Sequence, residues 1–128
     1  KMAIYAVKIG VSADAVSILG FITGIVAAFL VGYGHFLLAL LFFSLNRLLD
    51  GLDGAIARVK IPTHRGAFLD IVFDFIIYSS IPFAFAVFND KNSFVACFII
   101  FSFVGTGTSF LAYGILQEKI SKKNKIII

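Results

Sequence analysis

The feature that most constrains this chain is its series of long apolar segments, each close to the length of a membrane-spanning helix. Such a helix needs about 20 mostly apolar residues, with a range near 17–25. Turn residues and charged residues bound four such segments, and we predict spans at residues 15–31, 36–49, 67–88 and 93–116. We expect the second span to continue as a polar helix from Asp50 to Arg58. Gly32 to His35 and Asn89 to Asn92 supply the connecting turns.

Composition excludes the main alternatives to a membrane protein. Of the 128 residues, 60% are hydrophobic and 14% are charged, whereas soluble domains carry roughly 25% charged residues. So few charges cannot cover a soluble surface, and a disordered chain requires low hydrophobicity. A single cysteine, Cys97, cannot build a disulfide scaffold. We therefore expect an all-α fold, namely a polytopic transmembrane helical bundle with four visible spans.

The positive charges predict how the bundle is oriented. Lysine and arginine gather on cytoplasmic loops, and here nine of the eleven occur at three places separated by pairs of spans. These residues are Lys1 and Lys8, then Arg58, Lys60 and Arg65, then Lys119, Lys122, Lys123 and Lys125. We expect both termini of the sequence and the loop after the second span to face the cytoplasm. The net charge of +4 is assigned to topology and lipid contact, with no nucleic-acid partner.

The sequence contains no internal repeat, so we interpret residues 1–128 as a single membrane domain. It begins with Lys1 and Met2 and ends in an apolar stub, residues 126–128, that is too short to span a membrane. These ends lead us to expect a longer protein that is shortened here after the fourth span.

Four of the seven acidic residues fall near the ends of the second and third spans that we place at the cytoplasm. A carboxylate in hydrocarbon costs roughly 2.5–3.5 kcal/mol on insertion scales, so each one calls for a partner or a function. Steps of three or four residues return to nearly the same side of a helix. Asp50 and Asp53 therefore share one face, as do Asp70 and Asp74, and we expect the two faces to meet.

The same four acids predict a metal site. Neighbouring carboxylates repel one another unless cations neutralise them, and hard oxygen ligands favour Mg²⁺, Mn²⁺ or Ca²⁺ over zinc. We predict two divalent ions. Gly54, Ala57 and Gly66 leave the backbone bare beside the acids. A diphosphate and its nucleotide fit that space, where Arg58 and Arg65 are candidates to neutralise the phosphates.

These residues resemble the signature of the CDP-alcohol phosphatidyltransferase family, which reads D-x2-D-G-x2-A-R and then G-x3-D-x3-D. The matching positions are Asp50, Asp53, Gly54, Ala57, Arg58, Gly66, Asp70 and Asp74. The spacer from Arg58 to Gly66 is one residue shorter than the commonest form. Residues 12–17 match only loosely the Thr-Pro-Asn that often precedes the first span.

The resemblance implies a Mg²⁺-dependent transferase of phospholipid biosynthesis. A substituted phosphate, such as a phosphatidyl group, would pass from a CDP-linked donor such as CDP-diacylglycerol to an alcohol hydroxyl, with release of CMP. The resemblance assigns Asp50, Asp53 and Asp70 to the metals, while Asp74 completes the site as the general base. It also implies six spans where four are visible. A homodimer, the acceptor alcohol and the choice between CDP-diacylglycerol and a CDP-aminoalcohol as donor stay open.

Other interpretations of the same residues remain. The acids suit a non-catalytic or cation-transporting membrane protein, and a prenyl-diphosphate transferase also places aspartate-rich helices around Mg²⁺. Arg58 either binds phosphate or reaches to the membrane interface. Arg47, one turn before Asp50, is interpreted as a counter-charge for the acids. Gly20 and Gly24 form a Gly-x-x-x-Gly pair, which we interpret as a helix-packing contact.

Overall fold

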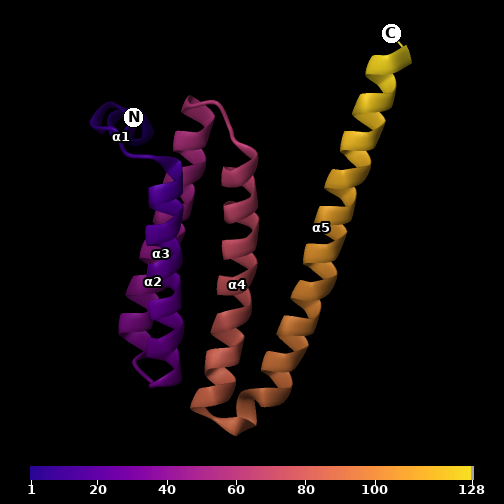
Figure 1. The fold of residues 1–128 in the computed structure, drawn as a ribbon. Coiled ribbons are helices and arrows are strands. Elements are labelled where there is room, and N and C mark those ends of the chain that lie inside the picture. The colour runs from indigo at the N-terminus through magenta and orange to yellow at the C-terminus, as the bar shows by residue number, and fades with distance from the viewer. Residues whose placement is uncertain (128) are drawn as a thin grey trace.

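The structure is a computed structural model that describes residues 1–127, and it is built from helices (Figure 1). In chain order the elements are α1 (Met2–Ile9), α2 (Ala13–Gly32), α3 (Phe36–Val59), α4 (His64–Phe88), the short 3-10 helix η1 (Asp90–Asn92) and α5 (Ser93–Ile127). None of the described residues forms a strand. The expected all-α class is therefore confirmed.

Local sequence signals set where the helices begin and end. The side-chain oxygen of Ser12 accepts a hydrogen bond of 3.1 Å from the backbone N–H of Ala15 at the start of α2. Thr63 accepts one of 3.0 Å from Gly66 at the start of α4. Such caps satisfy N–H groups that have no partner in the first helical turn. Gly34, with φ of 82°, makes the left-handed turn before α3, which confirms the predicted turn.

The sequence pattern did not predict α1, a helix of eight residues before the first span. It ends at Ile9, and Gly10 caps it in a left-handed conformation with φ of 86°. Ala3 of α1 packs against Val16 of α2 and Ile56 of α3. This contact holds α1 at the end of the bundle through three apolar residues distant in sequence, so no local pattern could reveal it.

The predicted end of the fourth span at Leu116 differs from the end of α5, which continues to Ile127. The continuation is polar, and Glu118 and Lys122 form an ion pair of 2.6 Å across one helical turn. Pairs with this spacing stabilise exposed helices. The stub expected at residues 126–128 is helical as far as Ile127, and Ile128 lies outside the described residues.

α2 is the central helix of the bundle. It packs along both α3 and α4, α4 packs against α5, and α1 packs against α3. α3 and α4 are not among the closely packed pairs, although a short loop joins them. α5 lies near α4 beside η1 and diverges from it towards the C-terminus (Figure 1). α2 therefore sets the relative positions of α3 and α4.

Two glycines of α2 permit this close packing. A Cβ at Gly20 would lie 3.3 Å from the Cβ of Leu49 in α3. A Cβ at Gly24 would lie 2.9 Å from Cγ1 of Ile77 in α4 and 3.0 Å from the side-chain nitrogen Nδ2 of Asn46 in α3. Such distances leave no room for a side chain. The interpretation of the two glycines as a helix-packing pair is confirmed.

Gly24→Ala is expected to destabilise the fold by about 1–3 kcal/mol, because the added methyl overpacks Ile77. The side chain of Ile77 is 1% exposed and has little space to move. Unfolding of the purified protein in detergent, followed by circular dichroism, measures the change. Gly51→Ala on α3 is the matched control, since a Cβ there meets nothing within 4 Å. Equal unfolding curves for Gly24→Ala and the wild type would contradict the expectation.

The long helices fit an integral membrane protein. α2, α4 and the segment from η1 through α5 are long and apolar enough to cross a membrane. α3 has 24 residues and therefore the necessary length, but its second half carries the charged residues Arg47, Asp50, Asp53 and Arg58. Among the described helices, three of the four predicted spans thus qualify by apolar character, and the other is a long helix interrupted by charge.

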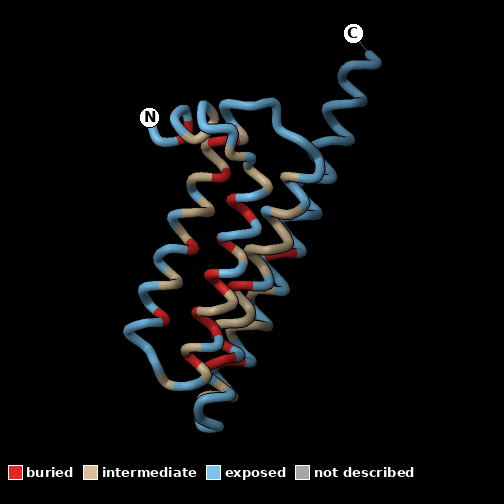
Figure 2. The backbone as a smooth tube through the Cα atoms, turned by 60° about the vertical axis from the view of Figure 1, so that its left-hand side comes forward, coloured by how far each residue is buried: buried red, intermediate tan, exposed pale blue. Residues whose placement is uncertain are grey.

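Most of the apolar surface faces outward. The buried positions gather along the middle of the bundle, whereas the helix that leads to the C-terminus is exposed along most of its length (Figure 2). Within the described part of α5 only Ala96 and Gly107 are buried. An outward apolar surface of this extent is compatible with lipid as the surrounding solvent.

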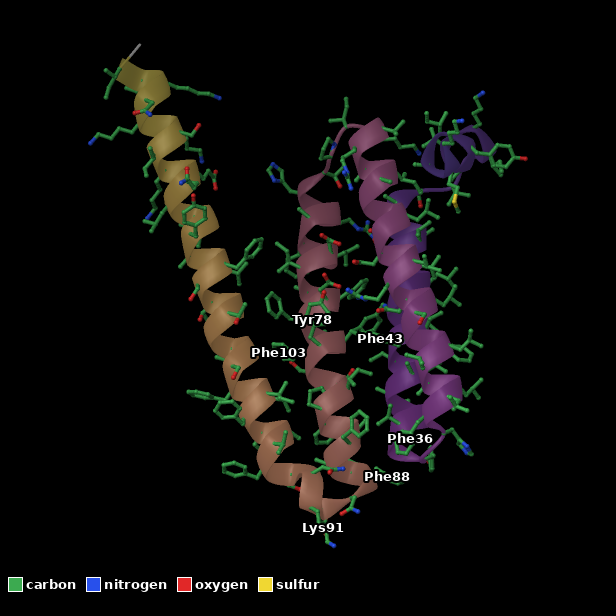
Figure 3. All side chains as sticks on the ribbon, turned by 180° about the vertical axis from the view of Figure 1, so that it is seen from behind. Phe36, Phe43, Tyr78, Phe88, Lys91 and Phe103 are labelled. Carbon is green, nitrogen blue, oxygen red and sulfur yellow. The ribbon has the colours of Figure 1, made fainter. Side chains whose placement is uncertain are left out.

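Both termini and the α3–α4 loop lie at one end of the bundle, while the α2–α3 turn and η1 lie at the other (Figure 1). A chain that crosses the membrane an even number of times has both of its ends on the same side, as in this arrangement. Lys91 is labelled at the far end, in η1 (Figure 3).

Candidate active site

Three of the four acids that we predicted to bind metal come together between α3 and α4. Asp50 from α3 and Asp70 and Asp74 from α4 each offer a carboxylate oxygen, and these oxygens lie within 4.8 Å of one another. At 1.5 Å of rise per residue, Asp70 lies about 9 Å and Asp74 about 15 Å from the start of α4. The acid cluster, defined as Asp50, Asp70 and Asp74, therefore lies about two to three turns along α4, with Asp70 exposed and Asp50 and Asp74 half-buried.

Asp53 lies apart from the acid cluster, on a side of α3 that faces α2. The residue is 5% exposed, and its Oδ2 accepts a hydrogen bond of 2.5 Å from the hydroxyl of Ser17 in α2. A buried carboxylate needs such a partner. The expected set of four is thus divided, with three acids between α3 and α4 and the fourth held by α2.

A cleft of about 320 Å³ lies at the same end of the bundle as the α3–α4 loop, and both Asp53 and Asp70 line it. Gly54, Ala57 and Gly66, the small residues that we expected to admit a nucleotide, also line this cleft. Their short side chains, or absence of one, leave the backbone accessible. Asp70 thus belongs to both the acid cluster and the cleft.

The basic residues expected near the phosphates do not line the cleft. Arg58 is exposed, and its Nε donates a hydrogen bond of 3.3 Å to the backbone oxygen of Gly54. Arg65 forms an ion pair of 3.4 Å with Asp14, an acid that does line the cleft. Lys60 is the basic residue that lines the cleft, although its position in the sequence had indicated only membrane orientation.

The donors of the acid cluster suit a hard divalent cation. Mg²⁺ and Ca²⁺ prefer carboxylate oxygens at about 2.0–2.6 Å, so two ligands of one ion lie at most about 4–5 Å apart. The spacing of 4.8 Å among Asp50, Asp70 and Asp74 meets this condition. Three carboxylates at this spacing also repel one another unless positive charge lies beside them.

Arg47 is the positive charge nearest these acids. Its Nη2 lies 2.9 Å from Oδ1 of Asp74, and its Nη1 lies 3.5 Å from Oδ2 of Asp50. The interpretation of Arg47 as a counter-charge for the acids is confirmed. Arg47 pairs with Asp50 on its own helix, α3, and also with Asp74 on α4.

Two contributors to the site were not predicted. The hydroxyl of Tyr78 accepts a hydrogen bond of 2.8 Å from Nη1 of Arg47. Tyr78 follows Asp74 by four residues and continues the stripe of Gly66, Asp70 and Asp74, so this spacing was a usable signal. Ser17 had no sequence signal except its position in residues 12–17, which match the family pattern only loosely and predicted no role for it.

Sequence comparisons relate the chain to known proteins. The profile of the family described as CDP-alcohol phosphatidyltransferase matches residues 11–127. The "Inner membrane protein YnjF" of Escherichia coli (strain K12) is 42% identical over 113 residues, which cover 88% of this chain and 55% of that protein. The chain therefore spans about half the length of this curated relative. No solved structure matches the chain significantly.

Proposed function

The chain belongs to the CDP-alcohol phosphatidyltransferase family, and on that premise we propose that it transfers a substituted phosphate, such as a phosphatidyl group, from a CDP-linked donor to an alcohol hydroxyl and releases CMP. The position of Asp70 is the observation that carries this proposal. Asp70 takes part in the acid cluster and also lines the cleft. A diphosphate at Asp70 would meet the acids, with its nucleotide over the small residues of the cleft.

We assign Asp50, Asp53 and Asp70 to two divalent ions, Mg²⁺ or Mn²⁺, and Asp74 completes that set. Support comes from the close carboxylate oxygens of the acid cluster and from the cleft that Asp53 shares with Asp70. When bound, such ions neutralise the diphosphate and polarise its phosphorus–oxygen bonds.

Asp74 is the proposed general base. It accepts the proton of the acceptor hydroxyl while that oxygen forms a bond to the phosphorus of the transferred group. The bond between this phosphorus and the CMP oxygen breaks, and CMP leaves with the electron pair. Arg47, 2.9 Å from Asp74, supports the assignment because it fixes the direction of the carboxylate.

We assign nucleotide binding to Gly54, Ala57, Arg58 and Gly66. Gly54, Ala57 and Gly66 line the cleft, and the side chain of Arg58 bonds back to Gly54 at its edge. A ribose or base over a glycine can approach the backbone closely. Lys60 in the lining adds a positive charge suited to a phosphate.

The cleft end of the bundle is proposed to face the cytoplasm, with residues 1–128 forming one membrane domain. Both termini and the α3–α4 loop lie at that end (Figure 1), where the sequence places most of its lysine and arginine. This distribution follows the positive-inside rule. A soluble CDP-linked headgroup or acceptor would then reach the acids from the cytoplasm, while lipid chains remain in the bilayer.

The test is release of CMP by the purified chain in detergent or lipid nanodiscs. CDP-diacylglycerol is supplied with radiolabelled glycerol phosphate, serine or inositol phosphate, and CDP-aminoalcohols are supplied with diacylglycerol. We expect one pairing to yield CMP and a labelled lipid in equal amounts, with Mg²⁺ or Mn²⁺ present and not with EDTA. Lipid chromatography identifies the product.

The same measurement separates the alternative functions. A prenyl-diphosphate transferase would release pyrophosphate from a prenyl donor and would not be protected by cytidine nucleotides. A cation transporter would move metal across vesicles without consuming any CDP-alcohol. Inertness towards every CDP-alcohol in the panel, by a chain that is folded and binds metal, would reject the proposed transfer.

A further inference from the structure

Each of the three nitrogens of the Arg47 guanidinium donates a hydrogen bond. Its Nε donates a hydrogen bond of 2.8 Å to the side-chain oxygen of Asn46. Its Nη1 donates one of 2.8 Å to Tyr78 and lies 3.5 Å from Asp50, while Nη2 donates one of 2.9 Å to Asp74. A planar fork of donors fixed at this many points has little freedom to rotate.

Aromatic rings and a third helix add to this restraint. The guanidinium carbon of Arg47 lies 5.0 Å from the ring centre of Tyr78 in α4 and 5.7 Å from that of Phe43 in α3. Both rings are labelled near the middle of the bundle (Figure 3). Asn46 in turn donates a hydrogen bond of 2.7 Å to the backbone oxygen of Gly20 in α2. Arg47 thus links three helices.

The restraint falls unequally on the acid cluster. Asp74 makes the closest contact with Arg47 and is also 3.5 Å from the hydroxyl of Tyr78. Asp50 is further away, at 3.5 Å. Among the described residues, none forms an ion pair or a side-chain hydrogen bond with the carboxylate of Asp70. The three carboxylates lie close together, but Arg47 holds Asp74 most strongly, Asp50 less and Asp70 not at all.

We infer that Arg47 is a positioning residue that competes with divalent ions for Asp74, so that the ions are held mainly by the other three acids and Asp74 stays aligned to accept a proton. The inference rests on the proposed function and extends it, because it states how one cluster of like acids is divided between metal binding and base catalysis. The competition is electrostatic, since a fixed positive charge beside the cluster opposes the arrival of another cation.

Binding of Mn²⁺ alone to the full chain in detergent tests this competition, with free Mn²⁺ measured by electron paramagnetic resonance. Arg47→Gln removes the charge and is expected to bind Mn²⁺ at least about tenfold more tightly, as loss of a unit charge at this range allows. Arg47→Lys keeps the charge and is expected to stay within about threefold of the wild type. CMP release is expected to fall in both variants, because neither side chain has a planar guanidinium that donates to Asp74 and Tyr78 together.

A purely structural role for Arg47 predicts the opposite direction, because a disordered acid cluster binds metal more weakly. Lys91→Gln is the matched control, since it removes one exposed positive charge at the far end of the bundle and is expected to leave Mn²⁺ affinity unchanged. Arg47→Met, which keeps the apolar stem beside Phe43, repeats the charge removal if Arg47→Gln loses helical structure by circular dichroism.

Each outcome decides the inference. Unchanged or weaker Mn²⁺ binding in both neutral variants, which remain helical, overturns it. Absence of Mn²⁺ binding in the wild type and in these variants overturns both the inference and the metal-dependent function. Tighter binding in the neutral variants, combined with no CMP release from any CDP-alcohol, upholds the competition at Asp74 and rejects the transfer reaction alone.

Discussion

Asp70→Asn is expected to lower kcat/KM for CMP release by about 10³-fold, the scale on which a charged group that acts on the transition state contributes. Asp70 links the acid cluster to the cleft, so its charge serves both the proposed metals and the diphosphate. Asparagine keeps the shape and removes the charge. The measurement is initial-rate CMP release at saturating Mg²⁺ with the donor and acceptor that the panel identifies.

Asp90→Asn provides the matched control, because it makes the same chemical change at an exposed acid in η1 at the other end of the bundle. We expect wild-type rates from it. The fold should survive both changes, since Asp70 is exposed and its neutralisation reduces repulsion among the acids. Wild-type turnover by Asp70→Asn would remove the observation on which the proposed function depends.

Gly54→Leu is expected to reduce CMP release by about 100-fold at low donor concentration, mainly through KM, because lost substrate binding without lost chemistry appears in KM. A Cβ at Gly54 meets only the end of the Arg58 side chain, at 3.9 Å, so the protein itself has room for a larger residue. The leucine side chain would instead occupy the cleft of about 320 Å³ that the nucleotide is proposed to enter.

Gly51→Leu is the control for this substitution. It places the same side chain on the same helix, at a position where a Cβ meets nothing within 4 Å. Gly51 does not line the cleft. Its activity should match the wild type. Thermal stabilisation by CDP-alcohol gives a second readout, because a ligand that binds the folded state raises its stability. Equal losses in both variants would show that the cleft is not the nucleotide site.

The four long helices and one face of the site were predictable from local pattern. Apolar length located the spans, and the steps of four between Gly66, Asp70 and Asp74 placed these residues on one side of α4. Asp50 then joined Asp70 and Asp74 as expected. These inferences depend only on the period of the helix and on the cost of charge in hydrocarbon, both of which are properties of short segments.

The position of Asp53 could not be predicted in the same way. Residues three apart on a helix differ by about 60° in direction, so Asp50 and Asp53 share a face only loosely. The rotation of α3 about its axis decides which acid faces which neighbour, and that rotation depends on how α3 packs along α2, as at the contact of Leu49 with Gly20. Asp53 accordingly meets Ser17 in α2. Such a contact belongs to the tertiary fold, which the spacing of acids does not describe.

Because the backbones of α3 and α4 pack closely on α2 and not on each other, the separation of their carboxylates depends on α2 as well as on Arg47, which bridges the two helices. Gly20 and Gly24 lie outside the cleft lining, yet they fix how near the two acid-bearing helices approach. We therefore expect substitutions at these two positions to alter metal affinity and the proposed turnover without changing any residue proposed to meet the substrate. A screen for altered metal preference belongs as much in the first span as in the aspartate motif.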